Sequence, residues 1–463
     1  MKEELLAALA PHGQEHLLAF WDELNVEDQQ SLAEQIGKVD LGQLARLFEH
    51  RDEHGDFREM AKKAGPPPAF RLDKSANRFS SAEAVQRGKE ALDAGQLGVI
   101  LVAGGQGTRL GFKHPKGMFP IGPVSDRSLF QIHVEKIIAV GRRHGVRIPL
   151  YLMTSPATHE ETIQYFAEND RFGLAEEDLM IFCQGTMPAV DAESGKMLLA
   201  DKHQLAVSPD GHGGMLAALA AGGCLDDIDR RGIKSLFYLQ IDNPLVDICS
   251  AEFVGYHLLS GSELSTQVIA KREPLEKVGN VVEVDGRVMV IEYSDLSDEA
   301  ANRREADGSL SIWAGSIGVH MMDAGMLRRL LGSDEALPFH IANKKVPHLG
   351  SDGKRVSPQQ TNAIKFERFI FDLIPSAENA MVVEVDPADG FAPLKNASGA
   401  PDDTPEAVRS RMVDQHTRWL RAADVEVAEG VEVEISPLFA VDAAELAAKI
   451  EPEMQVSEET YFC

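Results

Sequence analysis

The pattern of apolar and polar positions changes near residue 90 of this 463-residue chain. Before that point, EELLAALA, HLLAFWDEL and LGQLARLFEH carry apolar residues at three- and four-residue spacing, which predicts helices. GPPPAF at residues 65–70 predicts a stiff connector. The region has no cluster of reactive side chains, so residues 1–90 are interpreted as a helical N-terminal segment for packing or interaction.

From residue 95 onward, short apolar runs alternate with amphipathic segments. The predicted strands are GVILVA (98–103), IPLYLMTS (148–155), LMIFCQG (179–185) and KSLFYLQIDN (234–243). Between them, SLFQIHVEKIIAVGRRH, ATHEETIQYF and GGMLAALAAGG predict helices. Strands and helices in alternation predict an α/β fold with a doubly wound, mostly parallel, Rossmann-like sheet.

Two later segments predict smaller β structures. VVEVDGRVMVIEYSDL alternates with a period of two residues around Asp285-Gly286, which predicts a hairpin in an antiparallel extension. After FAPLKN (391–396), VEVAEGVEVEIS suggests short strands. The predicted domains are therefore residues 1–90, residues 91–390, and a small β-rich C-terminal lobe over 391–463.

Composition limits the functions available to this chain. A formal net charge of −27 argues against binding to nucleic acid or to anionic membranes, although a local basic site for a small anion stays open. No apolar run reaches the ~20 residues needed to span a bilayer, and the acidic N-terminus is unlike a signal peptide. The four cysteines form no CxxC pair, so reduced thiols in a soluble cytoplasmic protein are expected.

The first predicted strand leads into a glycine-rich loop, in the stretch VILVAGGQGTRLGFKHPKGMFPIG that starts at Val99. Ligands of doubly wound sheets bind at the carboxyl ends of strands, where this loop and QIDN both fall. The loop is not a dinucleotide fingerprint, because Leu110 replaces the third glycine, and it contains no Walker sequence. It is either a polyphosphate-binding loop or a strand-to-helix turn that needs glycine.

GGQGTRLG followed by PKGMFPIG resembles the nucleotide-binding signature of the UDP-sugar pyrophosphorylases, in particular the eukaryotic type of UDP-N-acetylhexosamine pyrophosphorylase. Further blocks resemble the same family, in its order: FCQGTMPAV, SPDGHGGML, QIDNPL, VGNVVEVDG with IEYSDL, LPFHIANKKVPH, NAIKFERFIFD and FAPLKN. The resemblance covers roughly residues 97–440 and makes residues 91–390 a nucleotidyltransferase catalytic domain.

The resemblance implies that a sugar 1-phosphate attacks the α-phosphorus of UTP and expels pyrophosphate. The attacking phosphate is already ionised, so the reaction needs positioning and positive charge and no general base. By the resemblance, the backbone at Ala103, Gly104, Gly105 and Gly107 holds the uridine and the phosphates. Glycine allows close approach of the backbone N–H groups to the nucleotide.

The side chains implied for the nucleotide are Arg109 at the pyrophosphate, Lys116 at the α-phosphate, and Gln184 with the backbone of Gly211 at the uracil. Lys395, the third catalytic residue, also matches a phosphate-binding lysine of the family. The lysines and Gln184 have plainer alternatives: a surface charge for each lysine and a structural amide for Gln184.

Asp242 ends a predicted buried strand, where an unpaired carboxylate is costly. Mg²⁺ bridging Asp242 to substrate phosphates would remove that cost, because Mg²⁺ prefers few protein carboxylates together with phosphate oxygens. The plainer interpretation of its neighbour Asn243 is a helix N-cap. On the sugar side, Gly279 and Glu292 match residues of the family that bind sugar hydroxyls, and Lys365, like Lys395, matches one of its phosphate-binding lysines.

Two further sugar-side positions depart from the N-acetylhexosamine pattern. His212 and Ser316 stand where that branch usually carries asparagine, and the spelling GHG resembles UDP-glucose and broad UDP-sugar pyrophosphorylases. N-acetylglucosamine 1-phosphate is therefore the first expected substrate and glucose 1-phosphate the alternative. A UDP-sugar glycosyltransferase would normally show a DxD pair, whereas QIDN has one aspartate. A nucleotide-sugar sensor would lack the charged residues named above.

Overall fold

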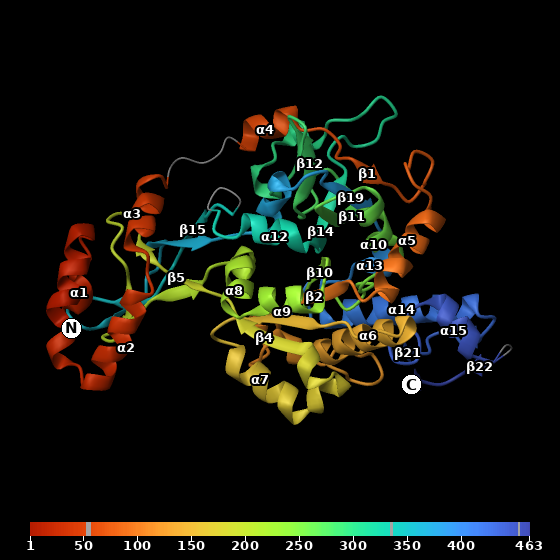
Figure 1. Ribbon diagram of the computed structural model, residues 1–463, viewed down its shortest axis with the longest axis horizontal. Helices are drawn as coiled ribbons and strands as arrows, with labels where there is room; N and C mark the ends of the chain where they lie inside the picture. The colour runs from red at the N-terminus through yellow and green to blue at the C-terminus, as the bar shows by residue number, and fades with distance from the viewer. Residues whose placement is uncertain (52–56, 334–336, 452–453) are drawn as a thin grey trace. The chain divides into compact units, whose positions relative to one another are not determined.

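The computed structural model describes residues 1–51, 57–333, 337–451 and 454–463 (Figure 1). Contacts between residues divide the chain into two compact units. Unit 1 comprises Met1–Asp56, Gln184–Ala217 and Ser333–Asp372, and unit 2 comprises Phe57–Cys183, Ala218–Gly332 and Leu373–Cys463. Both units are discontinuous in sequence. The consecutive domains with boundaries at residues 90 and 390 stay a prediction.

Unit 2 is built on one large mixed sheet with the strand order β1-β19-β11-β14-β10-β2-β3-β4. Strands β10, β2, β3 and β4 are mutually parallel, and only β14 runs antiparallel to both of its neighbours along this path. The bounds are β1 Ala69–Phe70, β19 Met381–Glu384, β11 Leu264–Ala270, β14 Ala314–Asp323, β10 Ser235–Gln240, β2 Leu97–Val102, β3 Leu150–Thr154 and β4 Leu179–Cys183.

Helices cover both faces of the parallel strands. Val99 and Leu101 of β2 belong to the core formed with Phe130 of α6 (Leu129–His144). On the other face, the Tyr151 hydroxyl of β3 donates to Asp227 of α9 (Cys224–Arg231) at 2.8 Å. Alternate residues of a strand point to opposite faces, so these contacts place α6 and α9 on opposite sides (Figure 1). The predicted doubly wound α/β fold is confirmed.

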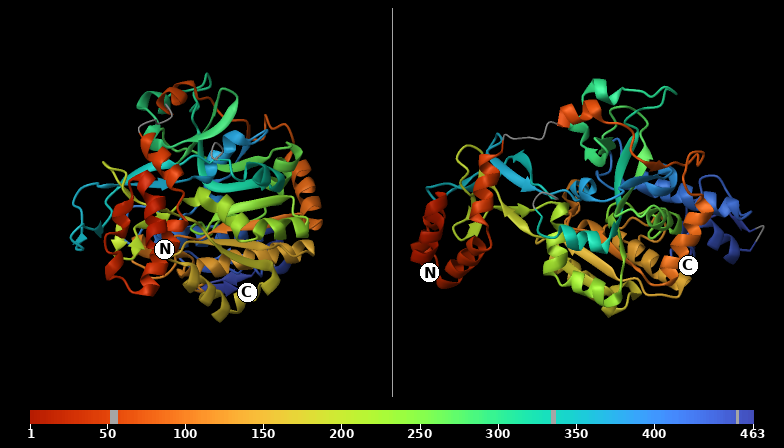
Figure 2. Two further views of the ribbon diagram at one scale, coloured as in Figure 1. Left: turned by 60° about the vertical axis from the view of Figure 1, so that its left-hand side comes forward. Right: turned by 45° about the horizontal axis from the view of Figure 1, so that its top comes forward.

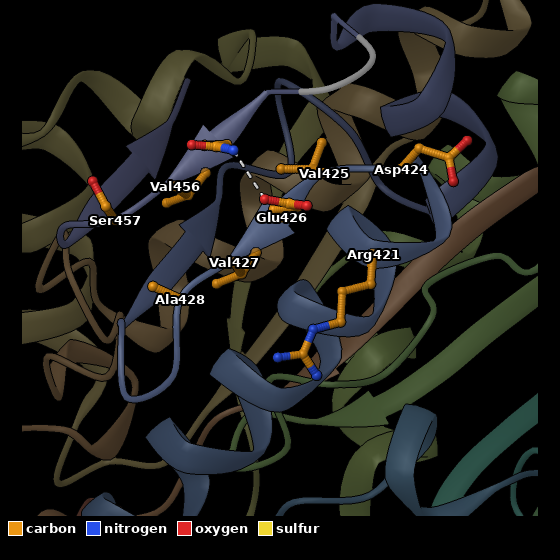
Figure 3. A pocket seen from close by; sticks show the side chains of 9 residues that line it. Arg421, Asp424, Val425, Glu426, Val427, Ala428, Val456 and Ser457 are labelled. Carbon is orange, nitrogen blue, oxygen red and sulfur yellow. Dashed lines mark hydrogen bonds between the residues drawn. The ribbon is translucent and has the colours of Figure 1, made fainter.

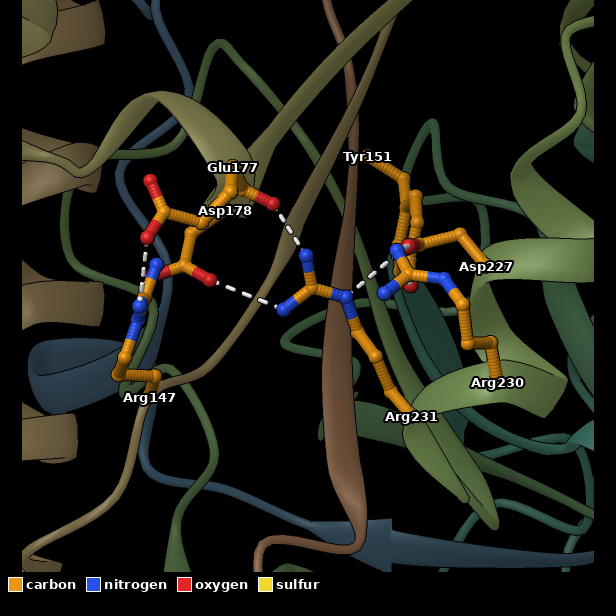
Figure 4. A network of polar contacts seen from close by, with 7 residues as sticks. All are labelled: Arg147, Tyr151, Glu177, Asp178, Asp227, Arg230 and Arg231. Carbon is orange, nitrogen blue, oxygen red and sulfur yellow. Dashed lines mark hydrogen bonds and ion pairs between the residues drawn. The ribbon is translucent and has the colours of Figure 1, made fainter.

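A network of ion pairs ties β3 and β4 to α9 (Figure 4). Arg231 joins the two buried carboxylates, with Nη1 2.9 Å from Asp178 and Nε 2.7 Å from Asp227. Arg147 and Arg230 add a second partner to Asp178 and Asp227 respectively. Removing one partner of such a buried group leaves an uncompensated charge, at a cost of roughly 3–5 kcal/mol. The network therefore holds this edge of the sheet.

Helices α5 (Ser81–Asp93) and α10 (Ala251–Leu259) lie side by side in unit 2 (Figures 1 and 2). A Cβ atom on Gly88 would lie 1.8 Å from the Ala251 carbonyl oxygen, and one on Gly255 would lie 1.7 Å from that of Ala84. The two glycines thus allow direct backbone contact between the helices. Although α5 falls in the predicted N-terminal segment, it packs as part of unit 2.

The predicted hairpin forms from β12 (Asn280–Val284) and β13 (Arg287–Ile291). Its turn residues Asp285 and Gly286 have φ of 50° and 79°, as a two-residue hairpin turn requires. Because β12 also pairs with β14, the hairpin extends the main sheet. The C-terminal lobe contains α14 (Pro405–Ala422), α15 (Ala443–Lys449), β20 (Glu426–Val427), β21 (Val433–Ile435), β22 (Gln455–Val456) and β23 (Thr460–Phe462).

Unit 1 combines α1 (Lys2–Leu9), α2 (Val26–Gly37) and α3 (Leu41–Glu49) with a sheet of order β15-β18-β6. The strands are β15 (His340–Lys344), β18 (Ala363–Glu367) and β6 (Val190–Asp191). HLLAFWDEL forms two 3₁₀ turns in place of the predicted regular helix. The Gln14 side chain bonds Gly195 and Met197 at the start of this segment, so tertiary contacts decide its local form.

GPPPAF was predicted to be only a connector, but its last two residues, Ala69 and Phe70, form β1 and pair in parallel with β19. The pairing partner lies more than three hundred positions away, so local sequence alone does not reveal it. No helix among the described residues combines the length and the apolar character that crossing a membrane requires.

Candidate functional site

The glycine loop begins where β2 ends, and its backbone is hydrogen-bonded to residues at the end of β3. The Ala103 N–H donates to Met153 at 2.8 Å, and the Gly104 carbonyl accepts from the Ser155 hydroxyl at 2.7 Å. Gly105 is exposed, and a Cβ atom there would have no neighbour within 4 Å. The Gly105 carbonyl accepts from the Lys116 N–H at 3.0 Å, so it is the Cα side of Gly105 that is open to a ligand.

Gly107 is held differently from Gly105. Its N–H donates to the His114 carbonyl at 3.1 Å, and a Cβ atom would lie 2.8 Å from Phe112. This glycine thus allows the loop to fold back on itself, and its N–H is already engaged. Arg109 follows on the short 3₁₀ helix η4 (Gly107–Leu110), exposed and without a hydrogen bond or ion pair to the described part of the chain.

The structure brings Lys116 and Asp242 together. Lys116 Nζ lies 3.6 Å from Asp242 Oδ2 and donates to the Leu394 carbonyl at 3.0 Å. The Leu394 N–H in turn donates to the Asp242 carbonyl at 2.8 Å. Both charged side chains are 17% exposed. The predicted α-phosphate lysine, the predicted metal ligand and the FAPLKN segment therefore meet at the carboxyl end of β10.

Lys395 reaches this region beside a carboxylate that the sequence reasoning missed. Its Nζ lies 3.9 Å from Asp403 Oδ2, and its N–H donates to the Asp403 carbonyl at 2.9 Å. Burial raises the pKa of Asp403, Lys395 acts in the opposite direction, and the charges of Asp402 and then Asp242 raise that pKa further. The only feature of the sequence that could have pointed to Asp403 is its position directly before Thr404, the N-cap of α14.

A divalent cation bound at Asp242 would need ligands besides this one carboxylate. Across residues 1–51, 57–333, 337–451 and 454–463, no three His, Cys, Asp or Glu side chains are grouped so that they could hold a metal ion. Asp242 supplies one partly exposed carboxylate. That donor fits Mg²⁺ bound mainly through substrate phosphate oxygens. The metal role of Asp242 stays a prediction.

Asn243 caps no helix, contrary to the plainer interpretation of its sequence. Its Oδ1 accepts from the Ala392 N–H at 3.0 Å and from the Leu245 N–H at 3.3 Å, and its Nδ2 donates to the Gly390 carbonyl at 2.8 Å. The side chain thus joins the segment after β10 to residues 390–392. This long-range role has no local signature.

Three predicted sugar-side residues lie together in unit 2. The Ser316 N–H donates to the Gly279 carbonyl at 2.8 Å. A Cβ atom on Gly279 would lie 3.7 Å from Glu292 Oε1 and 3.9 Å from the Cβ atom of Ser316. All three residues are partly exposed. The main sheet, through β14 and the hairpin, therefore gathers residues that are 37 positions apart from first to last.

The predicted uracil residues lie together in unit 1. Gln184 Nε2 lies 3.3 Å from both Asp210 Oδ1 and the Gly211 carbonyl oxygen. Asp210, which the sequence reasoning missed, is buried, and burial raises the pKa of its carboxyl. Gly211 has φ of 83°, and a Cβ atom would lie 2.3 Å from the Arg368 carbonyl oxygen, so only glycine fits.

His212 is an acceptor within unit 1. Its Nδ1 accepts from the Ile370 N–H at 3.1 Å, which places the proton of the neutral ring on Nε2. Burial lowers the pKa of His212 to about 4, so the ring is neutral near pH 7. Its ring packs against Phe369 and Phe371. Nε2–H is therefore the atom of His212 that can donate to a ligand.

Lys365 lies on β18 opposite Ala342 and is partly exposed. Its side chain has no hydrogen bond or ion pair with residues the structure describes. It belongs to unit 1 with Gln184 and His212, whereas Lys395 belongs to unit 2. The two predicted phosphate lysines are thus carried by different parts of the fold.

A groove on the C-terminal lobe contains none of the predicted site residues (Figure 3). It has a volume of about 630 Å³. Its lining residues come from the end of α14 and from β20 and β22: Arg421, Asp424, Val425, Glu426, Val427, Ala428, Gln455, Val456 and Ser457. Arg421 is the one cationic side chain among these lining residues, and the predicted phosphate-binding residues Lys116 and Lys395 lie elsewhere in unit 2.

Residues 61–426 match the family described as UTP–glucose-1-phosphate uridylyltransferase. The chain is 37% identical to the human UDP-N-acetylhexosamine pyrophosphorylase-like protein 1 over 91% of its own length and 86% of the relative's. It is also 37% identical to the UDP-N-acetylglucosamine pyrophosphorylase of Saccharomyces cerevisiae, over 92% of each chain.

Solved structures agree with these sequence matches. The UDP-N-acetylglucosamine pyrophosphorylase of Trypanosoma brucei aligns with a TM-score of 0.81 at 26% identity over 98% of each chain. UDP-glucose pyrophosphorylase of Leishmania major aligns with a TM-score of 0.61 at 15% identity, over 88% of this chain and 86% of that one, which shows a shared fold. The family resemblance is confirmed, and the chain belongs to the UTP–glucose-1-phosphate uridylyltransferase family.

Proposed function

We propose that this protein transfers the uridylyl group of UTP to N-acetylglucosamine 1-phosphate and releases pyrophosphate. The observation that carries the choice of sugar is the 37% identity, over more than nine-tenths of the chain, to a relative named for N-acetylglucosamine. The glucose enzymes among the solved structures share only 13–15% identity with the chain.

The residues gathered at the end of β10 suit this reaction. The sugar phosphate is a nucleophile that needs no general base, so the barrier is lowered by holding two anions in line and by balancing their charge. In this proposal Lys116 would contact the α-phosphate, and Arg109, whose side chain is exposed, would contact the pyrophosphate that leaves. Lys395 adds a third cation, held beside Asp403. Lys116 must exchange its contact with Asp242 for a contact with phosphate.

Asp242 would hold Mg²⁺ together with phosphate oxygens of the substrates. When bound, the cation would neutralise charge that develops on the phosphates. The partly exposed position of the Asp242 carboxylate beside Lys116 supports this assignment, because a ligand can approach it from solvent.

Glucose 1-phosphate is a second candidate substrate, favoured by His212. A pocket built to hydrogen-bond the acetamido group rejects an analogue without it by about 10⁴-fold or more, because its own polar groups are left unpaired. His212 has one ring nitrogen already satisfied by Ile370, so fewer groups would be left unpaired. We therefore expect turnover of both sugars, with N-acetylglucosamine 1-phosphate preferred.

The test measures pyrophosphate release from UTP and Mg²⁺ with N-acetylglucosamine 1-phosphate, glucose 1-phosphate and galactose 1-phosphate. The expected result is release with the first sugar and slower release with the second. Absence of release with every sugar phosphate would contradict the proposed activity. A higher kcat/KM for glucose 1-phosphate would reassign the substrate and leave the reaction class intact.

A further inference from the structure

Asp242 lies in a segment without regular secondary structure that connects β10 to α10. Lys136 of α6 is partly buried, and its side chain reaches into this segment. Its Nζ donates to the Pro244 carbonyl at 2.5 Å and to the Val246 carbonyl at 2.9 Å. One ammonium group thus fixes the backbone two and four residues after the predicted metal ligand.

His133 acts on the other side of Asp242, one helical turn before Lys136. It is fully buried, and its Nε2 lies 3.2 Å from the Ile241 carbonyl oxygen, to which it donates. Burial lowers the pKa of His133 to about 3, so the ring is neutral. Residues three apart lie on the same face of a helix. A single face of α6 therefore holds the carbonyls on both sides of Asp242.

The segment is also fixed from residues 390–394. The Asp242 carbonyl accepts from the Leu394 N–H at 2.8 Å. The Asn243 side chain contacts Gly390 and Ala392, as described above. These contacts fix the backbone at Asp242 and Asn243. The Asp242 carboxylate lies beside Lys116.

Lys136 is a costly way to stabilise a fold. Burial lowers its pKa to about 8, and the nearby carboxylate of Asp247 acts in the opposite direction. Removing an ammonium group from water costs several kcal/mol, and an apolar residue would suit the surrounding face of α6 better. The presence of the Lys136 charge here is explained if it fixes the geometry of the Asp242 segment and that geometry matters to function.

We propose that His133 and Lys136 are positioning residues, which fix the backbone around Asp242 so that its carboxylate is aimed at a divalent cation on the UTP phosphates. The inference rests on the proposed function, because that function gives Asp242 its metal. Groups that orient the ligands of a metal typically change metal affinity by about 10–100-fold when they are removed.

The test is the effect of Mg²⁺ on UTP affinity, measured by calorimetry in Mg²⁺ and in chelator without a sugar phosphate. Wild type should bind UTP more tightly in Mg²⁺. Lys136→Met keeps the length of the side chain and removes its charge. In this variant the ratio of UTP affinity in Mg²⁺ to UTP affinity in chelator should fall at least tenfold. Affinity in chelator should stay within about twofold of wild type, because contacts between UTP and the glycine loop are unchanged.

Lys271→Met is the matched control. Lys271 is a buried lysine whose pKa, like that of Lys136, is lowered to about 8 by burial, and its Nζ also contacts two oxygens, of Pro274 and Asn280. This variant should lose thermal stability yet keep the Mg²⁺ enhancement. Loss of the enhancement in both lysine variants would show a general loss of structure and would overturn the positioning role.

His133→Leu provides a second variant should Lys136→Met fail to fold, and it should also lose the enhancement. Retention of the enhancement within about twofold in a folded Lys136→Met or His133→Leu protein would overturn the inference. A wild-type protein that binds no UTP would instead contradict the proposed function. A wild-type protein that binds UTP equally with and without Mg²⁺ would overturn the metal role and the inference together.

Discussion

The predicted substrate residues of the two units differ in charge and in how they are held. In unit 2, Lys116 and Asp242 are oppositely charged, partly exposed and paired with each other. In unit 1, Gln184 and His212 are neutral and bonded to the backbone of Gly211 and Ile370. If these residues bind substrate as predicted, phosphate would have to displace an existing ion pair in unit 2, whereas a neutral ligand would meet groups in unit 1 that are already oriented.

The largest effect is expected from Asp242→Asn. This change removes the carboxylate at the end of β10 and keeps the shape of the side chain. Activity should therefore fall about 10³-fold, the upper end of the range for removal of one electrostatic group. The protein should still fold, because the Asp242 backbone makes the contact to Leu394. Steady-state rates and circular dichroism would check both parts. Turnover at the wild-type rate in chelator would contradict a metal role.

Lys116→Ala should reduce kcat by about 100-fold, corresponding to ~3 kcal/mol of transition-state stabilisation. A charge at the α-phosphate matters most as the bond to pyrophosphate breaks, so kcat should change more than the KM for UTP. Full saturation curves for UTP would separate the two constants. An unchanged kcat with a raised KM would make Lys116 a residue for ground-state binding only.

Asp403→Asn should have a smaller effect, about tenfold in kcat. The change leaves the Asp403 carbonyl in place for the Lys395 N–H, and removes only the charge 3.9 Å from Lys395 Nζ. Lys395 then loses orientation but keeps its own charge. Asp402→Asn is the matched control, since its carboxylate is next in sequence. Equal rates for both variants and wild type would show that Asp403 does not position Lys395.

The smallest effect concerns the choice of sugar. The double change His212→Asn with Ser316→Asn should raise the ratio of kcat/KM for N-acetylglucosamine 1-phosphate over glucose 1-phosphate about tenfold, because amides would hydrogen-bond the acetamido group and be left unpaired with glucose. The ratio is measured at saturating UTP. An unchanged ratio in a folded protein would show that these two positions do not set specificity.

Much of the fold could be predicted because strands and helices depend on near neighbours in the sequence. The alternation of VILVA with the amphipathic helix after Ser128 gave the doubly wound sheet, and Asp285-Gly286 gave the hairpin. The glycine loop and PKGM identified the family through their resemblance to its nucleotide-binding signature. Such patterns are read within ten or twenty residues, since the periodicities of helices and strands are local.

The tertiary structure decided which residues meet. Lys116 and Leu394 are 278 positions apart, and no periodicity links them. Asp403, Asp210 and Lys136 lack a motif of their own, so their roles depend on the carbonyls and charges that folding brings beside them. The sequence by itself determined most elements of the main sheet, the family and the kind of chemistry, but not the 3₁₀ turns of HLLAFWDEL or the pairing of β1 with β19. The pairing of Lys116 with Asp242 and the support from α6 arise only when strand order places the ends of distant segments at one edge of the sheet.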